Sequence, residues 1–490
     1  MNWNDTLRYL DQPLPEDIAR LKAAGWYTQA IAAIDRLLAE DVTRTQNGGE
    51  SPDRAENCLT ALPDGWRSGL LAEKEIMRRI PGEYPCDAAQ ALAHMQEKIP
   101  DMTKEEFDQL VQDNRIDWRF VEGKPHFARR FVETLLYTDD GFALRAGIRP
   151  DYEGRVRRGR QAEEIQRKGQ VSARIRLQFT MQASDEVFSR AMEKAKAEGR
   201  STVRAKFWLP APAACPTQSD IQIEDCWQQP TAVAPETAPQ RTLYWEAELA
   251  ENTPVTAVMS YTRTARYLDP LSLEPVENVT DAGFAPADYL GEQLPHIRFT
   301  PALRRLTEAV CADAADDAEK ASRIYDYVTL NVKYRFMPQY FILEDIAETC
   351  AHSRRGDCGV QALTFITMCR IAGIPAMWES GLSVSETEGS CHDWAMFWLA
   401  DKGWLYADCS FGGSAARRGE EALRRHYFGT LDTGRLAANH AFQAALTPPK
   451  ESWRADPYDN QAGEIELEGE GLAHGQFETT VKTLAYDFME

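Results

Sequence analysis

The stretch RRGDCGVQAL, residues 354–363, decides the fold of the C-terminal half of this chain. The run VQALTFITMCRIAGI that follows Cys358 carries a single charged residue, so a helix here is apolar on nearly every side and must be buried. Asp357 is well placed as its N-cap, and Gly373 followed by Pro375 ends it. The sequence therefore predicts that Cys358 lies in the first turn of a buried helix.

A cysteine at the start of a helix has two interpretations. Buried cysteines are common core residues, which is the simpler one. The other is a nucleophile, because the unpaired N–H groups and the dipole of a helix N-terminus favour a thiolate and can hold an oxyanion. The negative charge of Asp357 opposes ionisation, so an active Cys358 needs a cationic or basic partner.

The segment CHDWAMFWLADKGWLYADCSFGG, residues 391–413, predicts a β-hairpin. Two alternating runs, His392–Leu399 and Trp404–Ser410, flank a three-residue loop with Gly403 at its left-handed position. This register pairs even-numbered residues with even-numbered ones. One face of the hairpin then carries an imidazole, a carboxylate and several indole rings.

His392 and Asp408 share that face with Trp394, Trp398 and Trp404. The tryptophans are expected to form a wall between sheet and helix, with Trp394 near the cleft. An undistorted ladder would place His392 opposite Gly412, so a bulge or strong twist must bring the imidazole to Asp408. With Cys358, the two residues would form a thiol acyl-transfer triad.

The spacing of the apolar residues divides the chain into regions of different secondary structure. Residues 1–165 show helical spacing, with a capping-box signature at Thr103 and Glu106, and predict a helical domain. Residues 166–290 contain alternating runs such as VSARIRLQFTM and predict a β-sandwich-like domain with one helical insertion, DEVFSRAMEKAKAEG. Residues 291–450 mix helices and strands, and the acidic segment 451–490 is expected to be a solvated C-terminal extension.

The motifs GDCGVQAL, GIPAMWESG and HDWAMFWLADKGWLYAD resemble the transglutaminase-like superfamily, a branch of the papain-like thiol enzymes. Its pattern is G-x-C at a helix start, an H-x-W strand and a W-x-x-x-D strand, here in that order. The resemblance covers about 290–450, and the upstream RIYDYVTLNVKYRF is similar to the family's lead-in helix. It implies a multidomain α+β protein with a papain-like catalytic domain preceded by a sandwich.

The resemblance also implies a role for each motif residue. Cys358 would be the nucleophile, His392 the general base and acid, and Asp408 the residue that orients the imidazole. The Cys358 backbone N–H would be one oxyanion donor, and Tyr334 or Gln339 would supply another.

The composition limits which binding partners and which cellular compartment we expect for this protein. Acidic residues outnumber basic ones by 76 to 55, a formal charge of −21, which argues against nucleic acid or an anionic membrane as the partner. The N-terminal stretch shows no secretion signal, no run is long enough to span a membrane, and the ten cysteines follow no disulfide pattern. These features predict a cytoplasmic protein; the oligomeric state stays open.

The predicted function is hydrolysis of a peptide, protein or other amide substrate through a thioester acyl-enzyme. Two alternatives remain open: a protein-glutamine transglutaminase, and a non-catalytic binding or assembly protein that keeps the fold. No cofactor and no metal are expected, because the Cys and His residues near the motif lack zinc-ligand spacing and the acidic tail lacks a calcium-loop pattern.

Overall fold

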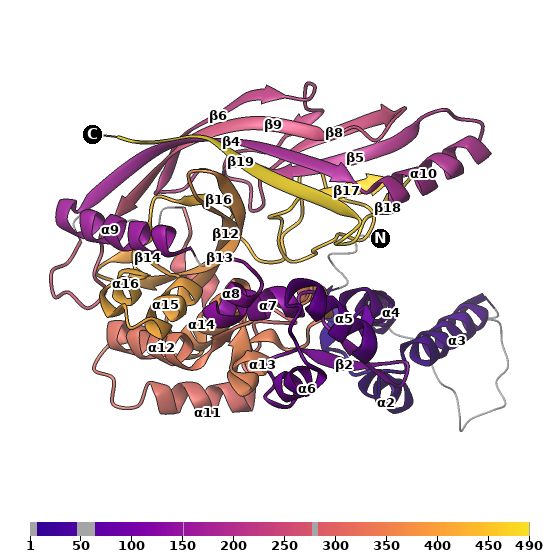
Figure 1. The fold of residues 1–490 in the computed structure, drawn as a ribbon, viewed down its shortest axis with the longest axis horizontal. Helices are drawn as coiled ribbons and strands as arrows, with labels where there is room; N and C mark the ends of the chain where they lie inside the picture. The colour runs from indigo at the N-terminus through magenta and orange to yellow at the C-terminus, as the bar shows by residue number, and fades with distance from the viewer. Residues whose placement is uncertain (1–6, 47–63, 150, 277–282, 490) are drawn as a thin grey trace. The chain divides into compact units, whose positions relative to one another are not determined.

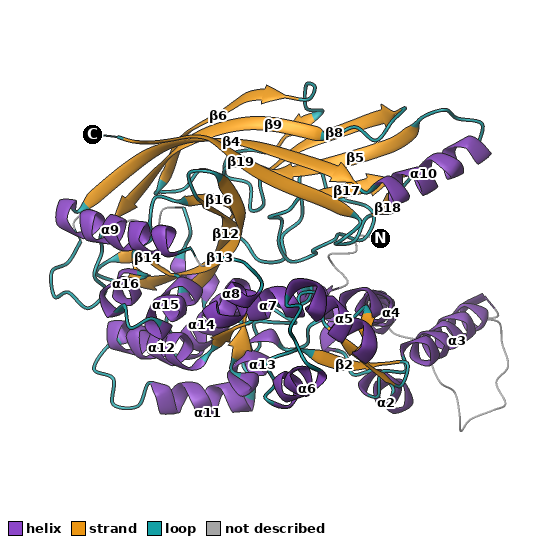
Figure 2. Ribbon diagram, in the orientation of Figure 1, coloured by secondary structure: helices purple, strands orange, loops and turns teal. Residues whose placement is uncertain are grey.

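The computed structural model describes residues 7–46, 64–149, 151–276 and 283–489 (Figures 1 and 2). The chain forms two compact units. The first unit contains Asp151–Tyr334 and Asp345–Glu490, and the second contains Asp5–Pro150 and Arg335–Glu344. None of the helices described is both long enough and apolar enough to cross a membrane.

The second unit is mainly helical, as its sequence period predicts. Its 3-10 helices are η1 (Leu7–Asp11) and η3 (Tyr340–Ile342), and its α-helices are α2 (Glu16–Ala23), α3 (Tyr27–Gln46), α4 (Asp64–Glu83), α5 (Ala88–Lys98), α6 (Lys104–Gln112), α7 (Phe131–Thr138) and α8 (Asp140–Arg145). A small antiparallel sheet joins β1 (Cys86–Asp87), β3 (Lys124–Phe127) and β2 (Trp118–Val121). The predicted cap of α6 is present, since the Thr103 side chain accepts from the Glu106 N–H at 3.1 Å.

The boundary of this unit differs from the expected 1–165. Helix α9 (Tyr152–Lys168) belongs to the first unit, while Arg335–Glu344 returns to the second. Arg335 pairs there with Asp117 at 3.1 Å, and Glu344 pairs with the buried Lys22 at 2.6 Å. These ion pairs hold the segment against the helices.

Two sheets of the first unit enclose one apolar core, in the region predicted to be sandwich-like. One contains β4 (Gln170–Ala183), β6 (Gln218–Cys226), β9 (Val255–Arg266) and β19 (Phe477–Phe488), and the other contains β5 (Val203–Pro210), β7 (Ala232–Val233), β8 (Thr242–Leu249), β17 (Glu464–Leu467) and β18 (Glu470–Gly471). The alternation in β4 is borne out, because Ile175, Leu177 and Phe179 are all fully buried. The predicted helical insertion is α10 (Asp185–Ala197).

The C-terminal residues are not the solvated extension that their charge suggested. Strand β17 pairs with β5, and β19 pairs with β4 along its whole length. The acidic side chains are neutralised in place: Glu464 accepts from Lys450 at 2.8 Å, and Glu468 pairs with Arg200 and Arg204. The expectation was wrong because the segment supplies strands to both sheets and carboxylates such as Glu464 and Glu468 have basic partners.

The remaining part of the first unit is a mixed α+β domain. Its helices are η2 (Pro286–Tyr289), α11 (Pro301–Val310), α12 (Asp317–Asn331), α13 (Ile346–Ser353), α14 (Cys358–Ile371), α15 (Cys409–Arg417) and α16 (Glu421–His426). Its strands are β10 (Lys333–Tyr334), β11 (Arg355–Gly356), β12 (Ala376–Val384), β13 (Glu388–Leu399), β14 (Gly403–Ala407), β15 (Phe428–Gly429) and β16 (Arg435–Asn439). Strands β10 and β11 form a two-stranded sheet of their own. Strand β19 pairs with β13 through Val481 and Gly389, so β12 to β16 share one nine-stranded sheet with β4, β6, β9 and β19 of the sandwich.

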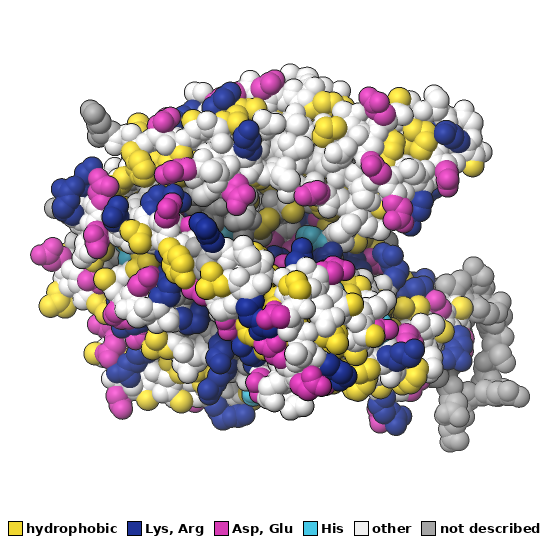
Figure 3. All heavy atoms as spheres, viewed as in Figure 1, with side chains coloured by type: hydrophobic (Ala, Val, Ile, Leu, Met, Phe, Trp, Pro, Cys, Tyr) yellow, Lys and Arg dark blue, Asp and Glu magenta, His cyan; other side chains and the backbone are white. Residues whose placement is uncertain are grey.

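The excess of negative charge is not gathered in one patch on the face shown in Figure 3. Acidic and basic side chains are interspersed there, with scattered hydrophobic groups between them.

Candidate active site

Helix α14 begins as the sequence predicts. The Asp357 side chain accepts from the Val360 N–H at 3.2 Å and caps the helix, and Cys358 is its first residue. Residues 359–370 are all buried, and Gly373 has the left-handed φ of +84° that ends the helix. The fold thus holds the Cys358 thiol at the N-terminus of a buried helix.

The β13–β14 hairpin forms with a different register from the one expected. Gly403 has the predicted left-handed conformation, with φ +82°, but it pairs with Leu399 and lies in the strand. Trp398 is therefore opposite Trp404. Extended beyond Ala395, this register would place His392 opposite Ser410 instead of Gly412. The predicted register was wrong by two residues, and this ladder has no bulge to bring the imidazole to the carboxylate.

The strand predicted at Trp404–Ser410 ends early, and this positions the carboxylate. Asp408 follows the last residue of β14 and caps α15, accepting from the Phe411 N–H at 2.9 Å. His392 Nε2 lies 2.7 Å from Asp408 Oδ2, with both side chains buried. The structure therefore brings these two predicted residues together.

A buried arginine that the sequence analysis did not identify completes this pair. Arg435 on β16 lies 3.0 Å from the Asp408 carboxylate and 3.1 Å from Asp432, and its guanidinium lies 4.3 Å from the centre of the Phe411 ring. Burial acts to raise the pKa of Asp408, but the charges of His392 and Arg435 bring it below its usual value. The signal was a lone arginine in the apolar run RLAAN.

The Cys358 thiol has a different partner from the predicted one. Its Sγ donates to Asp393 Oδ2 at 3.2 Å, and among the described residues no hydrogen bond joins it to His392. His392 and Asp393 are consecutive in β13, so their side chains project from opposite faces of the strand. Burial raises the pKa of Cys358 well above its usual value, and the charges of Asp393 and Asp357 raise it further. Both influences favour the thiol over the thiolate at Cys358.

Cys358 contacts β13 at a break in its ladder. One edge of β13 pairs with β19 at Gly389 and with β14 from Ala395 onward. Among the described residues, no strand pairs with the part of this edge that lies between Gly389 and Ala395. The start of α14 meets the strand at this break, as the thiol contact with Asp393 shows. The sulfur is thus one residue along the strand from His392.

Asp393 is itself held by the C-terminal segment. The Gln461 side-chain amide donates to Asp393 Oδ1 and to the His392 carbonyl, the latter at 2.8 Å. Burial raises the pKa of Asp393 well above its usual value, and the charges of Asp459 and Asp357 raise it further. Neither Gln461 nor Asp393 could be identified from motif spacing, because the contact depends on the fold of β17 and its preceding loop.

The secondary candidates fall in three different places. Tyr334 on β10 pairs in parallel with Gly356, two residues before Cys358. Gln339 belongs to the helical unit, where its backbone N–H and side-chain amide donate to Glu83 at 3.2 and 3.0 Å. Trp394, which was expected near the cleft, is fully buried, and its Nε1 donates to Glu379 at 2.8 Å. Its side chain therefore belongs to the core and lines no exposed surface.

The helix-start cysteine, the H-x-W strand and the W-x-x-x-D segment, on which the resemblance to the transglutaminase-like superfamily rests, lie in one α+β domain. Residues 304–409 match the family model of the transglutaminase-like superfamily, which confirms the resemblance found in the motifs. The chain therefore contains a domain of this superfamily.

Solved structures give more distant likenesses. A protein from Cytophaga hutchinsonii, proposed to be a cysteine protease, is 16% identical with a TM-score of 0.37, over 65% of this chain and 93% of its own. The periplasmic domain of TgpA from Pseudomonas aeruginosa is 14% identical with a TM-score of 0.26, over 55% of this chain and 96% of its own. No curated protein matches the chain in sequence.

Proposed function

We propose that this protein is a thiol-dependent acyl-transfer enzyme that hydrolyses a peptide, protein or other amide bond, with Cys358, His392 and Asp408 as its catalytic residues. The observation that carries the proposal is the buried His392–Asp408 pair, at 2.7 Å, one residue along β13 from the contact with the Cys358 sulfur. The Asp408 carboxylate is in turn paired with Arg435, so the group that would orient the imidazole is itself held in place.

In this proposal the two nitrogens of the His392 imidazole have different tasks. Nε2 lies against the Asp408 carboxylate, which stabilises the tautomer with its proton on Nε2. Nδ1 is then the nitrogen that accepts the thiol proton. Because the resting thiol donates to Asp393, the catalytic cycle begins when Cys358 exchanges that carboxylate for His392.

The reaction then follows thiol acyl transfer. The Cys358 sulfur bonds to the substrate carbonyl carbon, while the Cys358 N–H at the start of α14 stabilises the oxyanion. The carbon–nitrogen bond breaks as His392 protonates the leaving amine, which leaves a thioester. Water, deprotonated by His392, attacks the thioester carbon and releases the acid and the thiol.

The test is acylation by a simple activated ester, p-nitrophenyl acetate, followed by intact-mass and peptide mass measurement. We expect one acetyl group on Cys358, removable by hydroxylamine as a thioester should be, and no such adduct in Cys358→Ala. His392→Ala should slow acetylation about 100-fold or more, because a general base contributes roughly that factor.

Cys391→Ala is the matched control, because this exposed thiol directly precedes His392 in the same strand. It should be acetylated at Cys358 at the wild-type rate. Acetylation that persists at the wild-type rate in His392→Ala would contradict the proposed triad and favour the non-catalytic assembly protein.

A further inference from the structure

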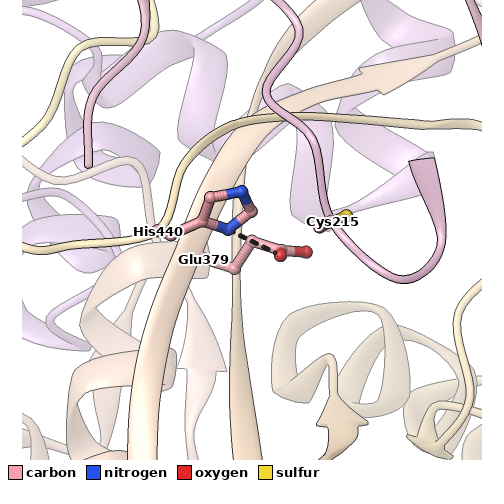
Figure 4. Close-up of side chains that lie close together, drawn as sticks. All are labelled: Cys215, Glu379 and His440. Carbon is pink, nitrogen blue, oxygen red and sulfur yellow. Dashed lines mark ion pairs between the residues drawn. The ribbon is translucent and has the colours of Figure 1, made fainter. Parts of the chain in front are cut away.

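A second group of reactive side chains lies in the first unit, apart from the residues given catalytic roles. Cys215 in the loop after β5, Glu379 on β12 and His440 directly after β16 each present one ligand atom, and these atoms lie within 4.8 Å of one another (Figure 4). Glu379 and His440 are buried and Cys215 is half-buried. The three residues are far apart in sequence, so no spacing could have predicted the cluster.

We propose that Cys215, Glu379 and His440 bind a divalent transition-metal ion of the zinc class. Thiolate sulfur, imidazole nitrogen and carboxylate oxygen are the donors that Zn²⁺ takes in proteins, and three such ligands leave a fourth position for water. A hard cation such as Ca²⁺ or Mg²⁺ would prefer an all-oxygen set, which this cluster does not offer.

The two carboxylate oxygens of Glu379 have different surroundings. Oε1 accepts from the Trp394 indole N–H at 2.8 Å and lies 4.0 Å from Arg263. Oε2 lies 3.0 Å from His440 Nδ1, yet neither atom has a hydrogen-bond partner of acceptable geometry. One oxygen is thus held by the indole N–H, and the other forms an ion pair with the His440 imidazole.

That separation suits two ligands of a single ion. With metal–ligand bonds of about 2.0–2.2 Å, an oxygen and a nitrogen bound to the same Zn²⁺ lie roughly 3 Å apart. Buried polar atoms without hydrogen-bond partners are rare in folded proteins, and coordination to an ion satisfies such atoms in place of a hydrogen bond. One ion between Glu379 and His440 therefore accounts for both their spacing and their missing hydrogen bonds.

Arg263 supplies the competing explanation. Its guanidinium lies 3.7 Å from the Cys215 sulfur and 4.0 Å from Glu379, so a neutral thiol, one carboxylate and one arginine already balance in charge. If that balance is the purpose of the cluster, the site takes no metal. Burial and the charge of Glu379 raise the pKa of the Cys215 thiol, and the charge of Arg263 acts only partly against them. Direct metal binding separates the two explanations.

The experiment uses the full chain, stripped with a chelator and titrated with Co²⁺ as a spectroscopic substitute for Zn²⁺. We expect one Co²⁺ per chain with a thiolate-to-cobalt charge-transfer band, displacement by Zn²⁺, and a zinc-dependent rise in melting temperature. In Cys215→Ser the band should be lost and Co²⁺ affinity should fall at least about a hundredfold, since even outer-shell partners of a metal are worth roughly 10–100-fold.

Cys226→Ser is the matched control, because Cys226 is another half-buried free thiol of the same sandwich. It should keep the band and the affinity. Variants of the other two ligands, Glu379→Gln and His440→Ala, are not needed for the test. If either fails to fold, Cys215→Ser and its control Cys226→Ser still decide whether the site binds metal, because serine closely matches cysteine in size. A wild-type chain without the band, or a band that survives in Cys215→Ser, would overturn the proposal.

Discussion

At the scale of single residues, the main feature of the candidate site is that a carboxyl group holds the Cys358 thiol. Asp393 accepts from the Cys358 thiol at 3.2 Å, and burial and the charges of Asp393 and Asp357 raise the pKa of that thiol. A thiol in this state reacts slowly, because the thiolate is the nucleophilic form. The resting protein is therefore expected to be less reactive at Cys358 than a helix-start cysteine would suggest.

Asp393→Asn tests this restraint. Asparagine can still accept from the thiol but carries no charge at any pH, so the pKa of Cys358 should fall. Below that pKa, each unit of decrease raises the thiolate fraction, and so the iodoacetamide labelling rate at Cys358, by about tenfold. The gain should be largest above the raised pKa of Asp393, because there the wild-type carboxyl is ionised and opposes the thiolate.

The matched control is Asp225→Asn, which removes the acidic neighbour of Cys226 in β6. It should change labelling at Cys226 and leave Cys358 at the wild-type rate. Equal labelling of Cys358 in wild type and Asp393→Asn across the pH range would mean that the Asp393 charge does not control this thiol.

The sequence identified side chains better than it identified their partners. Cys358, His392 and Asp408 stand in recognisable motifs, and the helix start was predicted from Asp357 and the apolar run after it. Asp393 and Arg435 were not found, because their roles depend on strand register and on which face of β13 meets α14. Such distances between elements leave no local periodicity.

At the scale of elements, the strand after α14 is confined on both sides. Strand β12 lies between β13 and β16, and its pairing with β16 shifts in register at Ser380 and Gly381. A Cβ on Gly381 would lie 2.0 Å from the Leu436 carbonyl oxygen. Backbone cannot yield as a flexible side chain can, so this position requires glycine.

We therefore expect Gly381→Ala to lower the free energy of unfolding by about 1–3 kcal/mol, the typical effect of overpacking. Urea denaturation with equal slopes for variant and wild type measures this difference. Gly159→Ala is the control: a Cβ there meets nothing within 4 Å in helix α9, so stability should stay unchanged or rise by up to about 1 kcal/mol. A neutral Gly381→Ala would show that β12 and β16 can separate at little cost.

Element types were predictable where a short-range period dominates, as in β4, α10 and α14. The hairpin turn at Glu468–Gly469, between β17 and β18, was not predictable in this way. Both residues have a positive φ, of 49° and 79°. Its glutamate lies in a charge-rich run that resembles a solvated tail, but it pairs with Arg200 and Arg204 of the sandwich. That pairing spans more than half the chain and leaves no local signal.

At the scale of the whole molecule, the last strand links two regions that the sequence separates. Strand β19 pairs with β4 of the sandwich from Phe477 to Phe488 and with β13 at Val481 and Lys482. The expected boundaries at 290 and 450 therefore cut through a continuous sheet. Because one sheet serves both regions, we expect the sandwich and the transglutaminase-like domain to unfold together.

Val481→Asp tests this coupling. Val481 is buried opposite Gly389, and an aspartate there would place an unpaired carboxylate in the apolar core at a cost of several kcal/mol. Hydrogen exchange measured against urea should show β4 and β13 losing protection at one urea concentration in the wild type, and at one lower concentration in the variant. Glu478→Gln, on an exposed position of the same strand, should leave both transitions unchanged. If β13 opened while β4 stayed protected, the shared sheet would not couple the two regions, and each would be an independent folding unit.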